Sequence, residues 1–448
     1  MINQTSLCFL HHVGEELDMK QIHLKKSLLA SSLSMALSMA LLAPAAFATN
    51  GLAPTGLGQE HKAMGGAAAG NPVNTMSMAT NPASASFIAD GWDVELELFK
   101  PNRTVTRTAG LPPATFKGNE KSIFVIPGGG YKKQLNDKYA VGVTVYGNGG
   151  MNTEFKTGPS FISPGTAGFP PAGTVIPFSR SGANSGINLE QLFIAPTLGI
   201  KLNGSHSLGV SANIVYQQFS AEGIGSLAGG SSDPTNFTNR GTDSAQGLGA
   251  TIGWMGRMSK TTTMGASYQL ETKMSKFKKY KGLFANGGRL NIPAKFTIGL
   301  SNQVTPKTRL ALDIQQIYYS KLDATGNSSS NGKLFGSNGG PGFGWDDQTV
   351  IKFGLKHQLT PKLALMGGYN HADSPVKAED TFFGALAPAV VEDHLSLGFE
   401  YKLNKKASLL GSYTHAFSNI VKGDLSKGTP FDLEMDQDAI GIGYSVKF

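Results

Sequence analysis

The last ten residues of the chain, 439–448, alternate between apolar side chains and small or polar ones. The apolar members are Ile440, Ile442, Tyr444, Val446 and Phe448. Because side chains of a strand point alternately to its two faces, this segment predicts a strand with one apolar face. Soluble β-sandwiches also contain such strands. A chain that ends on one at an aromatic residue is typical of bacterial outer-membrane barrels.

The same alternation recurs from Trp92 onward, and most of the segments approach the roughly 9–11 residues that cross a membrane at a tilt. The predicted strands are 92–100, 121–133, 138–149, 188–202, 206–220, 246–258, 262–275, 291–303, 308–319, 348–360, 362–372, 392–404, 406–418 and 436–448.

The connections between these segments alternate strictly between short and long, six short and seven long. Short periplasmic turns and long outer loops are typical of outer-membrane barrels, whereas a soluble sandwich has no reason to separate them. The sequence therefore predicts an all-β protein, a 14-stranded antiparallel transmembrane β-barrel. Closure places Trp92 beside Phe448, and we expect Lys447 to form an interior ion pair there with Asp93 or Glu95. A lysine solvated in the periplasm is the open alternative.

The N-terminal region reads as a leader. Residues 19–48 have a basic start, an apolar stretch and an Ala46-Phe47-Ala48 cleavage site, the pattern of a secretory signal peptide. Either Met1 or Met19 is the start. The single Cys8 precedes the cleavage site, so we expect no disulfide in the mature chain. The predicted division is 1–48 leader, 49–91 a Gly- and Ala-rich segment without alternation, and 92–448 barrel.

Other functional classes find little support in the sequence. The net charge of +8 forms no basic stripe with interleaved aromatic residues, so we expect no nucleic-acid partner. There is no Gly-x-Ser-x-Gly and no His-Glu-x-x-His motif. We expect no cofactor, no metal ion and no enzymatic activity.

Three stretches resemble one family. These are Gly51–Ala83, which ends in Thr80-Asn81-Pro82-Ala83, then Tyr146–Thr153 and Tyr280–Phe284. They are similar to the FadL-type long-chain fatty acid transporters of the Gram-negative outer membrane (OmpP1/FadL/TodX). The resemblance implies a monomeric barrel blocked by an N-terminal hatch, with Asn81, Pro82 and Ala83 at its end. It also implies passive transport of long-chain fatty acids or similar hydrophobic compounds.

In this family the substrate leaves sideways through a kinked third strand. Here that strand ends in Tyr146-Gly147-Asn148-Gly149-Gly150, and glycine clusters permit bulges. We therefore place the lateral-opening kink at Gly147, Gly149 and Gly150. A glycine-rich entry into a surface loop is the alternative.

The resemblance implies capture of the substrate by outer loops. The candidate residues in these loops are Ile224, Leu227, Phe237, Phe277, Tyr280, Lys281, Leu283 and Phe284, which we expect to form an exposed apolar patch with nearby lysines. The lysines attract a carboxylate, bind lipopolysaccharide phosphates, or are merely solvated. Arg257, Lys295 and Lys352 have lumen-facing parity and are candidates for binding a carboxylate inside. Pairing with acids such as Glu97 and Asp313 is the alternative.

Several readings stay open at this point. The same architecture carries monoaromatic hydrocarbons, for which no interior cation is needed. A barrel lipid-modifying enzyme and a permanently sealed structural barrel are further alternatives. The expected partners are a fatty acid or other hydrophobic ligand, outer-membrane lipid, lipopolysaccharide, and the barrel assembly machinery through Phe448.

Overall fold

The structure is a computed structural model that describes residues 50–448, apart from 109–110, 157, 163–173, 180–183 and 428–430. The predicted leader and Cys8 lie outside the described residues.

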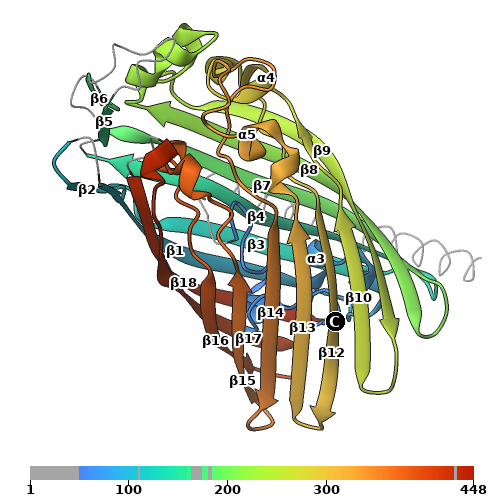
Figure 1. Cartoon of the computed structure of the whole chain (residues 1–448). Coiled ribbons are helices and arrows are strands. Elements are labelled where there is room, and N and C mark those ends of the chain that lie inside the picture. The colour runs from blue at the N-terminus through green and yellow to red at the C-terminus, as the bar shows by residue number, and fades with distance from the viewer. Residues whose placement is uncertain (1–49, 109–110, 157, 163–173, 180–183, 428–430) are drawn as a thin grey trace, which may run out of the picture. The chain divides into compact units, whose positions relative to one another are not determined.

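Fourteen antiparallel strands form a closed barrel (Figure 1). Each pairs with two neighbours, and the β1–β18 and β9–β10 pairings complete the ring. The strands are β1 (Gly91–Arg107), β3 (Phe124–Gln134), β4 (Tyr139–Phe155), β7 (Ser185–Lys201), β8 (His206–Glu222), β9 (Asp243–Arg257), β10 (Thr262–Gln269), β12 (Lys295–Thr305), β13 (Thr308–Ile317), β14 (Gln348–Gln358), β15 (Leu363–Ala372), β16 (Asp393–Lys402), β17 (Ala407–Val421) and β18 (Phe431–Lys447). The fourteen predicted strands are confirmed in number and order.

Alternating side chains determine which face of each strand meets lipid. On β1, Val94, Leu96 and Leu98 are exposed on the outside, while Asp93, Glu95 and Glu97 are buried inside. The same alternation runs along β16 and β18. Every backbone N–H and C=O in lipid needs a hydrogen-bond partner. Closing the ring pairs the backbone groups of the two edge strands, which an open sheet would leave unpaired.

The first and last strands close the barrel as predicted, with Gly91 opposite Lys447. The predicted interior ion pair at this point is wrong. Lys447 is exposed and, among the described residues, forms no salt bridge. The carboxylates bind the N-terminal segment instead. Asp93 accepts hydrogen bonds from the Thr75 amide (2.8 Å) and hydroxyl, and Glu95 accepts one from the Gln59 amide (3.0 Å).

Short elements fill the long loops at the end of the barrel opposite the C-terminus (Figure 1). In the loops lie η2 (Gly225–Gly230), η3 (Pro234–Asn236), η4 (Lys278–Tyr280), α4 (Ala285–Gly288), η5 (Tyr319–Lys321), α5 (Asp323–Gly326), η6 (Ala378–Asp380), α6 (Thr381–Gly384) and η7 (Leu425–Lys427). Strand β2 (Ala114–Lys117) pairs with β1, β11 (Lys273–Met274) pairs with β9, and β5 (Ser160–Ile162) pairs with β6 (Val175–Pro177).

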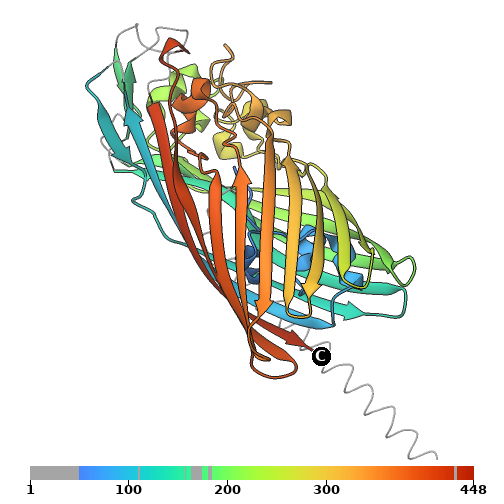
Figure 2. The ribbon, with the colours of Figure 1, turned by 60° about the horizontal axis from the view of Figure 1, so that its bottom comes forward.

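Residues 50–90 form a segment inside the ring of strands, which we call the hatch (Figure 2). It contains α2 (Gln59–Ala63), α3 (Ser77–Thr80) and η1 (Pro82–Ser86). Asn81 begins η1, because its side chain accepts a hydrogen bond from the Ala83 amide and Pro82 occupies the first turn. Nearly all of the hatch is buried.

The described residues contain no helix that is both long and apolar enough to cross a membrane. The same residues contain no group of three or more His, Cys, Asp or Glu side chains that could hold a metal ion.

Candidate functional site

The ladder between β3 and β4 stops partway along the wall. Their pairing ends at Gly128↔Tyr146. Beyond that point, among the described residues, 124–127 of β3 pair with β1 alone and 147–153 of β4 pair with β7 alone, until Glu154 also bridges to Asn119. We call this unpaired stretch the lateral gap. A β-barrel wall normally has every backbone group paired between strands, so an interruption of this length sets this part of the wall apart.

Strand β4 changes its environment where the gap begins. Every residue of 146–153 is buried, so the inside–outside alternation seen at 139–145 is lost. A strand in a simple barrel wall would keep one face in lipid. This part of β4 is therefore covered on both faces, as an inward-displaced strand would be.

The three glycines of the predicted kink lie at this point. The β4–β7 register shifts between Gly147 and Gly149, which marks a bulge, and Gly150 follows it opposite Glu190. Gly149 has φ +147°, and a Cβ there would lie 1.6 Å from the Leu52 carbonyl oxygen. Only glycine fits this contact without displacing the hatch backbone.

On the β3 side of the gap, a proline interrupts the ladder, and the sequence analysis missed it. Pro127 on β3 has no N–H to donate to a ladder, and three glycines follow it at 128–130. The Pro-Gly-Gly-Gly run inside a predicted strand was the available signal, because proline belongs on unpaired strand edges.

The start of the hatch lies behind the gap. The Tyr319 side chain from the outer loops holds it there. The Tyr319 hydroxyl accepts hydrogen bonds from the Leu52 amide (2.8 Å) and the Ala53 amide (3.2 Å) and donates one to the Asn50 carbonyl (2.6 Å). Since Leu52 also packs on Gly149, one short segment connects the outer loops to the gap.

A buried arginine defines the outer edge of the gap. Arg103 on β1 is 1% exposed, and its guanidinium donates to the Asn152 carbonyl (2.9 Å) and side-chain oxygen (2.7 Å) on β4. It also donates to the Lys121 carbonyl (2.6 Å) and to the Asn119 side chain (3.2 Å). The bonds to Asn152 cross from β1 to β4 where the ladder is missing.

The apolar loop residues predicted for substrate capture do meet, but in the interior. Ile224, Leu227, Phe237, Phe277, Tyr280, Leu283 and Phe284 are all between 0% and 3% exposed. The expectation of an exposed patch is therefore wrong, because the outer loops pack on one another and cover these side chains. We call this packed set, with the rings that join it, the outer core.

Aromatic contacts run through the outer core toward the hatch. Phe219 lies 4.7 Å from Phe284 and 4.9 Å from Tyr280, measured between ring centroids. A second series of contacts joins Phe237, Phe335, Phe383, Phe343, Trp345 and Tyr319, with centroid separations of 4.8–5.7 Å. The second series ends on the ring that binds Leu52 and Ala53.

Lys281 is held by a loop contact. Its ammonium lies 2.8 Å from the Asp233 carboxylate on the neighbouring loop. Hydrogen bonds from Lys281, Thr235 and Asn236 lower the pKa of Asp233 below its usual range. The candidate carboxylate ligand of the outer loops is thus already paired with an acid of the chain itself.

The three candidate interior cations lie in different surroundings. Arg257 is exposed at the turn end of β9, its guanidinium 5.6 Å from the Phe87 ring centroid. Lys352 is buried opposite Asp313 and donates to the Thr55 carbonyl (2.9 Å). Lys295 is half-buried on the inward face of β12 and has no hydrogen-bond or salt-bridge partner among the described residues.

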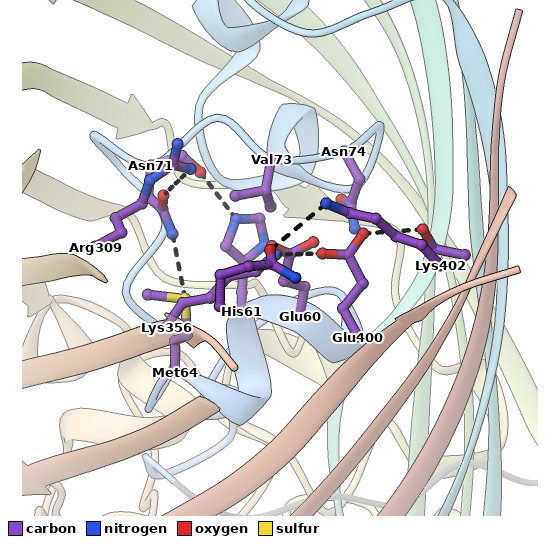
Figure 3. Close-up of polar contacts among 12 residues, drawn as sticks. Glu60, His61, Met64, Asn71, Val73, Asn74, Arg309, Lys356, Glu400 and Lys402 are labelled. Carbon is purple, nitrogen blue, oxygen red and sulfur yellow. Dashed lines mark hydrogen bonds and ion pairs between the residues drawn. The ribbon is translucent and has the colours of Figure 1, made fainter. Parts of the chain in front are cut away.

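Charged contacts that the sequence analysis did not pair join the hatch to the wall. Lys356 of β14 lies 2.6 Å from both Glu60 of the hatch and Glu400 of β16 (Figure 3). The Lys62 ammonium lies 2.6 Å from the Glu97 carboxylate of β1. The sequence analysis had suggested Glu97 as a partner for the candidate interior cations, but it pairs with the hatch. Asp313 accepts from the Ala68 and Ala69 amides, both at 2.8 Å. The inward parity of the strand residues among these charges was the only sequence signal, and the hatch residues Glu60 and Lys62 gave none.

The opposite side of the hatch meets the wall through uncharged groups. The Asn81 side chain donates to the Trp254 carbonyl (2.9 Å), and the Ser207 hydroxyl donates to the Ala83 carbonyl (2.9 Å). The hatch therefore spans the lumen from β14–β18 and β1 to β8 and β9.

Solved structures with the same fold are transport barrels. The toluene transporter TodX of Pseudomonas putida has a TM-score of 0.63 and 19% identity over 89% of this chain and 99% of its own. The Ralstonia pickettii toluene transporter TbuX scores 0.59 with 18% identity over 88% and 99%. A Pseudomonas aeruginosa FadL homologue scores 0.59 with 14% identity over 89% and 99%. At these identities the likeness shows the fold alone.

No curated protein sequence matches the chain. The sequence model of the outer membrane protein transport protein family (OMPP1/FadL/TodX) matches residues 179–448, more than half of the chain. With the closed fourteen-stranded barrel, this match shows that the chain belongs to the OMPP1/FadL/TodX family of outer-membrane transporters of hydrophobic compounds.

Proposed function

We propose that this protein moves hydrophobic molecules with an acidic head group, such as long-chain fatty acids, from the outer loops into the outer membrane. They leave through the lateral gap. The observation that carries the proposal is the missing β3–β4 ladder beyond Gly128↔Tyr146, with the hatch start behind it. No nucleotide-binding motif occurs in the sequence, so the transport is passive.

The outer core supplies the apolar path toward the gap. Each methylene moved from water into such surroundings contributes about 0.8 kcal/mol, so an acyl chain gains most of its affinity from burial alone. The packed rings must separate to admit it. Their contacts end at Tyr319, and this residue holds Leu52 and Ala53 in front of Gly149.

Lys295 supports an acidic rather than a neutral substrate. A half-buried ammonium without a partner is costly, and a carboxylate would satisfy it. Lys281 and Lys352 are less suitable, because Asp233 and the Thr55 carbonyl already bind them.

Monoaromatic hydrocarbons are the second candidate substrate class. The aromatic composition of the outer core favours them, and TodX and TbuX are toluene transporters. A neutral ring has no use for Lys295. We propose no enzymatic activity. Binding of lipopolysaccharide and of the assembly machinery through Phe448, and a monomeric state, remain predictions.

The test is uptake of labelled oleate and toluene by cells that lack their own transporter and express this protein. We expect Lys295→Met to reduce oleate uptake about tenfold, because a charge-assisted hydrogen bond is lost, and to leave toluene uptake unchanged. Lys295→Arg keeps the charge and serves as the matched control.

Equal loss of both substrates in Lys295→Met would contradict the proposed head-group role. Uptake of toluene without oleate by the unaltered protein would move the assignment to hydrocarbons. Absence of both, in a protein shown to be folded in the outer membrane, would refute transport of either class.

A further inference from the structure

The six short turns at the end of the barrel that carries the C-terminus are built alike. In each, one side-chain oxygen accepts hydrogen bonds from the amides two and three residues later, at 2.8–3.3 Å. The capping residues are Asn136, Asn203, Ser259, Thr305, Thr360 and Asn404. This is the local hydrogen bonding by which Asn, Ser and Thr fix a turn. The turns are therefore rigid and present their flanking side chains in the same way.

The residue before each capping residue is a large apolar side chain, between 43% and 59% exposed. These residues are Leu135, Leu202, Met258, Val304, Leu359 and Leu403. Each continues the lipid-facing alternation of its strand, as Leu403 does after Phe399 and Tyr401 on β16. The six side chains therefore mark the edge of the apolar band on the periplasmic side.

An exposed lysine follows the capping residue by one or two positions in five of the six turns. These lysines are Lys138, Lys260, Lys307, Lys362, Lys405 and Lys406. Among the described residues none of the six forms a salt bridge, and the turns contain one acid, Asp137. By contrast, Lys132 and Lys133 nearby are neutralised by Asp90 at 2.9 and 2.7 Å.

We propose that this ring of turns, the turn rim, binds the phosphate groups of anionic phospholipids in the periplasmic leaflet. The chemistry is complementary at each turn. The apolar side chain lies at the acyl boundary, and the lysine extends to the headgroup level. A lysine near an anionic membrane surface gains roughly fivefold in affinity. Solvation alone would account for the lysines but not for the exposed apolar side chain repeated in all six turns.

The experiment uses the purified, folded mature protein and counts bound lipids by native mass spectrometry. The probes are phosphatidylglycerol and phosphatidylcholine with identical acyl chains at equal concentration. We expect the unaltered protein to retain the anionic lipid at least about tenfold better. Replacing the six rim lysines by Gln should bring this ratio close to one. A variant with all six replaced by Arg should keep the preference, because it keeps the charge.

A charge-matched control removes six exposed lysines from the outer loops. These are Lys273, Lys276, Lys278, Lys321, Lys333 and Lys422, each changed to Gln. This control should retain the preference. An unchanged preference in the rim Gln variant would overturn the proposal, and so would an equal loss in the outer-loop control. Complete displacement of the lipid by millimolar inorganic phosphate would also overturn it, in favour of a site for the free anion. Loss of folding in the Gln variant, checked by thermal denaturation, would leave the Arg and outer-loop variants to decide.

Discussion

Two contacts between neighbouring strands of this barrel are built in opposite ways. At the seam, β1 and β18 stay paired from Gly91↔Lys447 to Arg107↔Phe431. At the lateral gap, the pairing of β3 and β4 stops at Gly128↔Tyr146. The seam alternates large apolar residues outside with the carboxylates of β1 inside, whereas the gap begins at Pro127 of β3 and at the glycine-rich residues 147–150 of β4. The two contacts thus differ first in whether their residues can sustain a ladder, and we expect the gap to be the one that parts.

The hatch repeats this difference. Toward the seam and its neighbours it is held by ion pairs, Lys62–Glu97 and Glu60–Lys356–Glu400, each at 2.6 Å. Toward the gap its start lies against the Gly149 backbone and is held by one phenol, that of Tyr319. We expect the end of the hatch behind the gap to be the part that moves at least cost, because no ion pair among the described residues holds it there.

Crosslinking should give the largest difference in uptake between the lateral gap and the seam. The mature chain is expected to lack cysteine, so each variant can carry one introduced pair of cysteines and no other thiol. Pro127→Cys with Gly147→Cys spans the gap, and Leu96→Cys with Ile442→Cys spans the seam, where the two residues are opposed. Joining the gap with a bifunctional thiol reagent should lower oleate uptake at least about tenfold, because a joined wall cannot part.

The seam pair provides the control. Its crosslinked form should transport like the unaltered protein, and a cleavable reagent should restore uptake to the gap pair once it is cut. If both crosslinked forms transported equally well, lateral exit at this place would be refuted.

A single methyl group at the bulge should have the next largest effect. Gly149→Ala places a Cβ 1.6 Å from the Leu52 carbonyl oxygen at a φ that favours glycine. We expect a local cost of about 1–3 kcal/mol, as for other overpacked sites, and a fall in oleate uptake of several-fold. The measurement is uptake together with the thermal stability of the purified barrel.

Gly367→Ala on β15 is the matched substitution. Its Cβ would meet only ordinary contacts, at 3.9 Å from Leu397 and Ser396. It should leave uptake and stability unchanged. Equal effects of the two alanines would mean that Gly149 matters only as a strand glycine and not through its contact with Leu52.

On the seam side, the hatch should depend on Lys356. Lys356→Met leaves the carboxylates of Glu60 and Glu400 close together without their shared cation (Figure 3). Breaking a buried ion pair from one side typically costs about 3–5 kcal/mol. We expect α2 to lose protection in hydrogen exchange while the barrel strands keep theirs. Lys402→Met is the control, since within the part of the chain that the structure describes Lys402 reaches only the Gln358 side chain, at 3.5 Å. Unchanged protection of α2 would show that the ion pairs do not hold the hatch.

The sequence predicted the barrel because its determinants are local. Alternation with period two decides which face of a strand meets lipid, and the difference between short and long connections decides the topology. Both signals survive shifts of strand ends by a few residues. The seam register, Trp92 near Phe448, then followed from closure alone.

The candidate site was harder to predict because its contacts join segments far apart in the chain. Tyr319 meets Leu52 across 267 positions, and nothing local to either residue indicates the other. Glu97 showed inward parity, but parity cannot choose between a hatch partner such as Lys62 and a strand partner. The expected exposed patch was wrong for a related reason: apolar loop residues become buried only if the loops pack together, as Phe237 and Phe335 do.

The smallest effect should come from the loop contact between Asp233 and Lys281, which lies away from both walls. Hydrogen bonds from Lys281, Thr235 and Asn236 lower the pKa of Asp233. A lowered folded-state pKa means that the contact stabilises the loops above the carboxyl's unfolded value of about 3.9 and is lost as the pH falls through the folded value. Because the pair is exposed, the gain is small and screened by salt.

Spin labels at Arg240→Cys and Lys278→Cys report on this contact, since they flank it on the two loops. Their distance distribution should stay narrow at neutral pH and broaden only in acid. Asp233→Asn should broaden it slightly at every pH and remove the acid transition, because no carboxylate remains to titrate. An acid transition that persists in Asp233→Asn would place its origin in another group. Oleate uptake at neutral pH should be nearly the same in both proteins, because this contact lies outside the path from Tyr319 to the lateral gap.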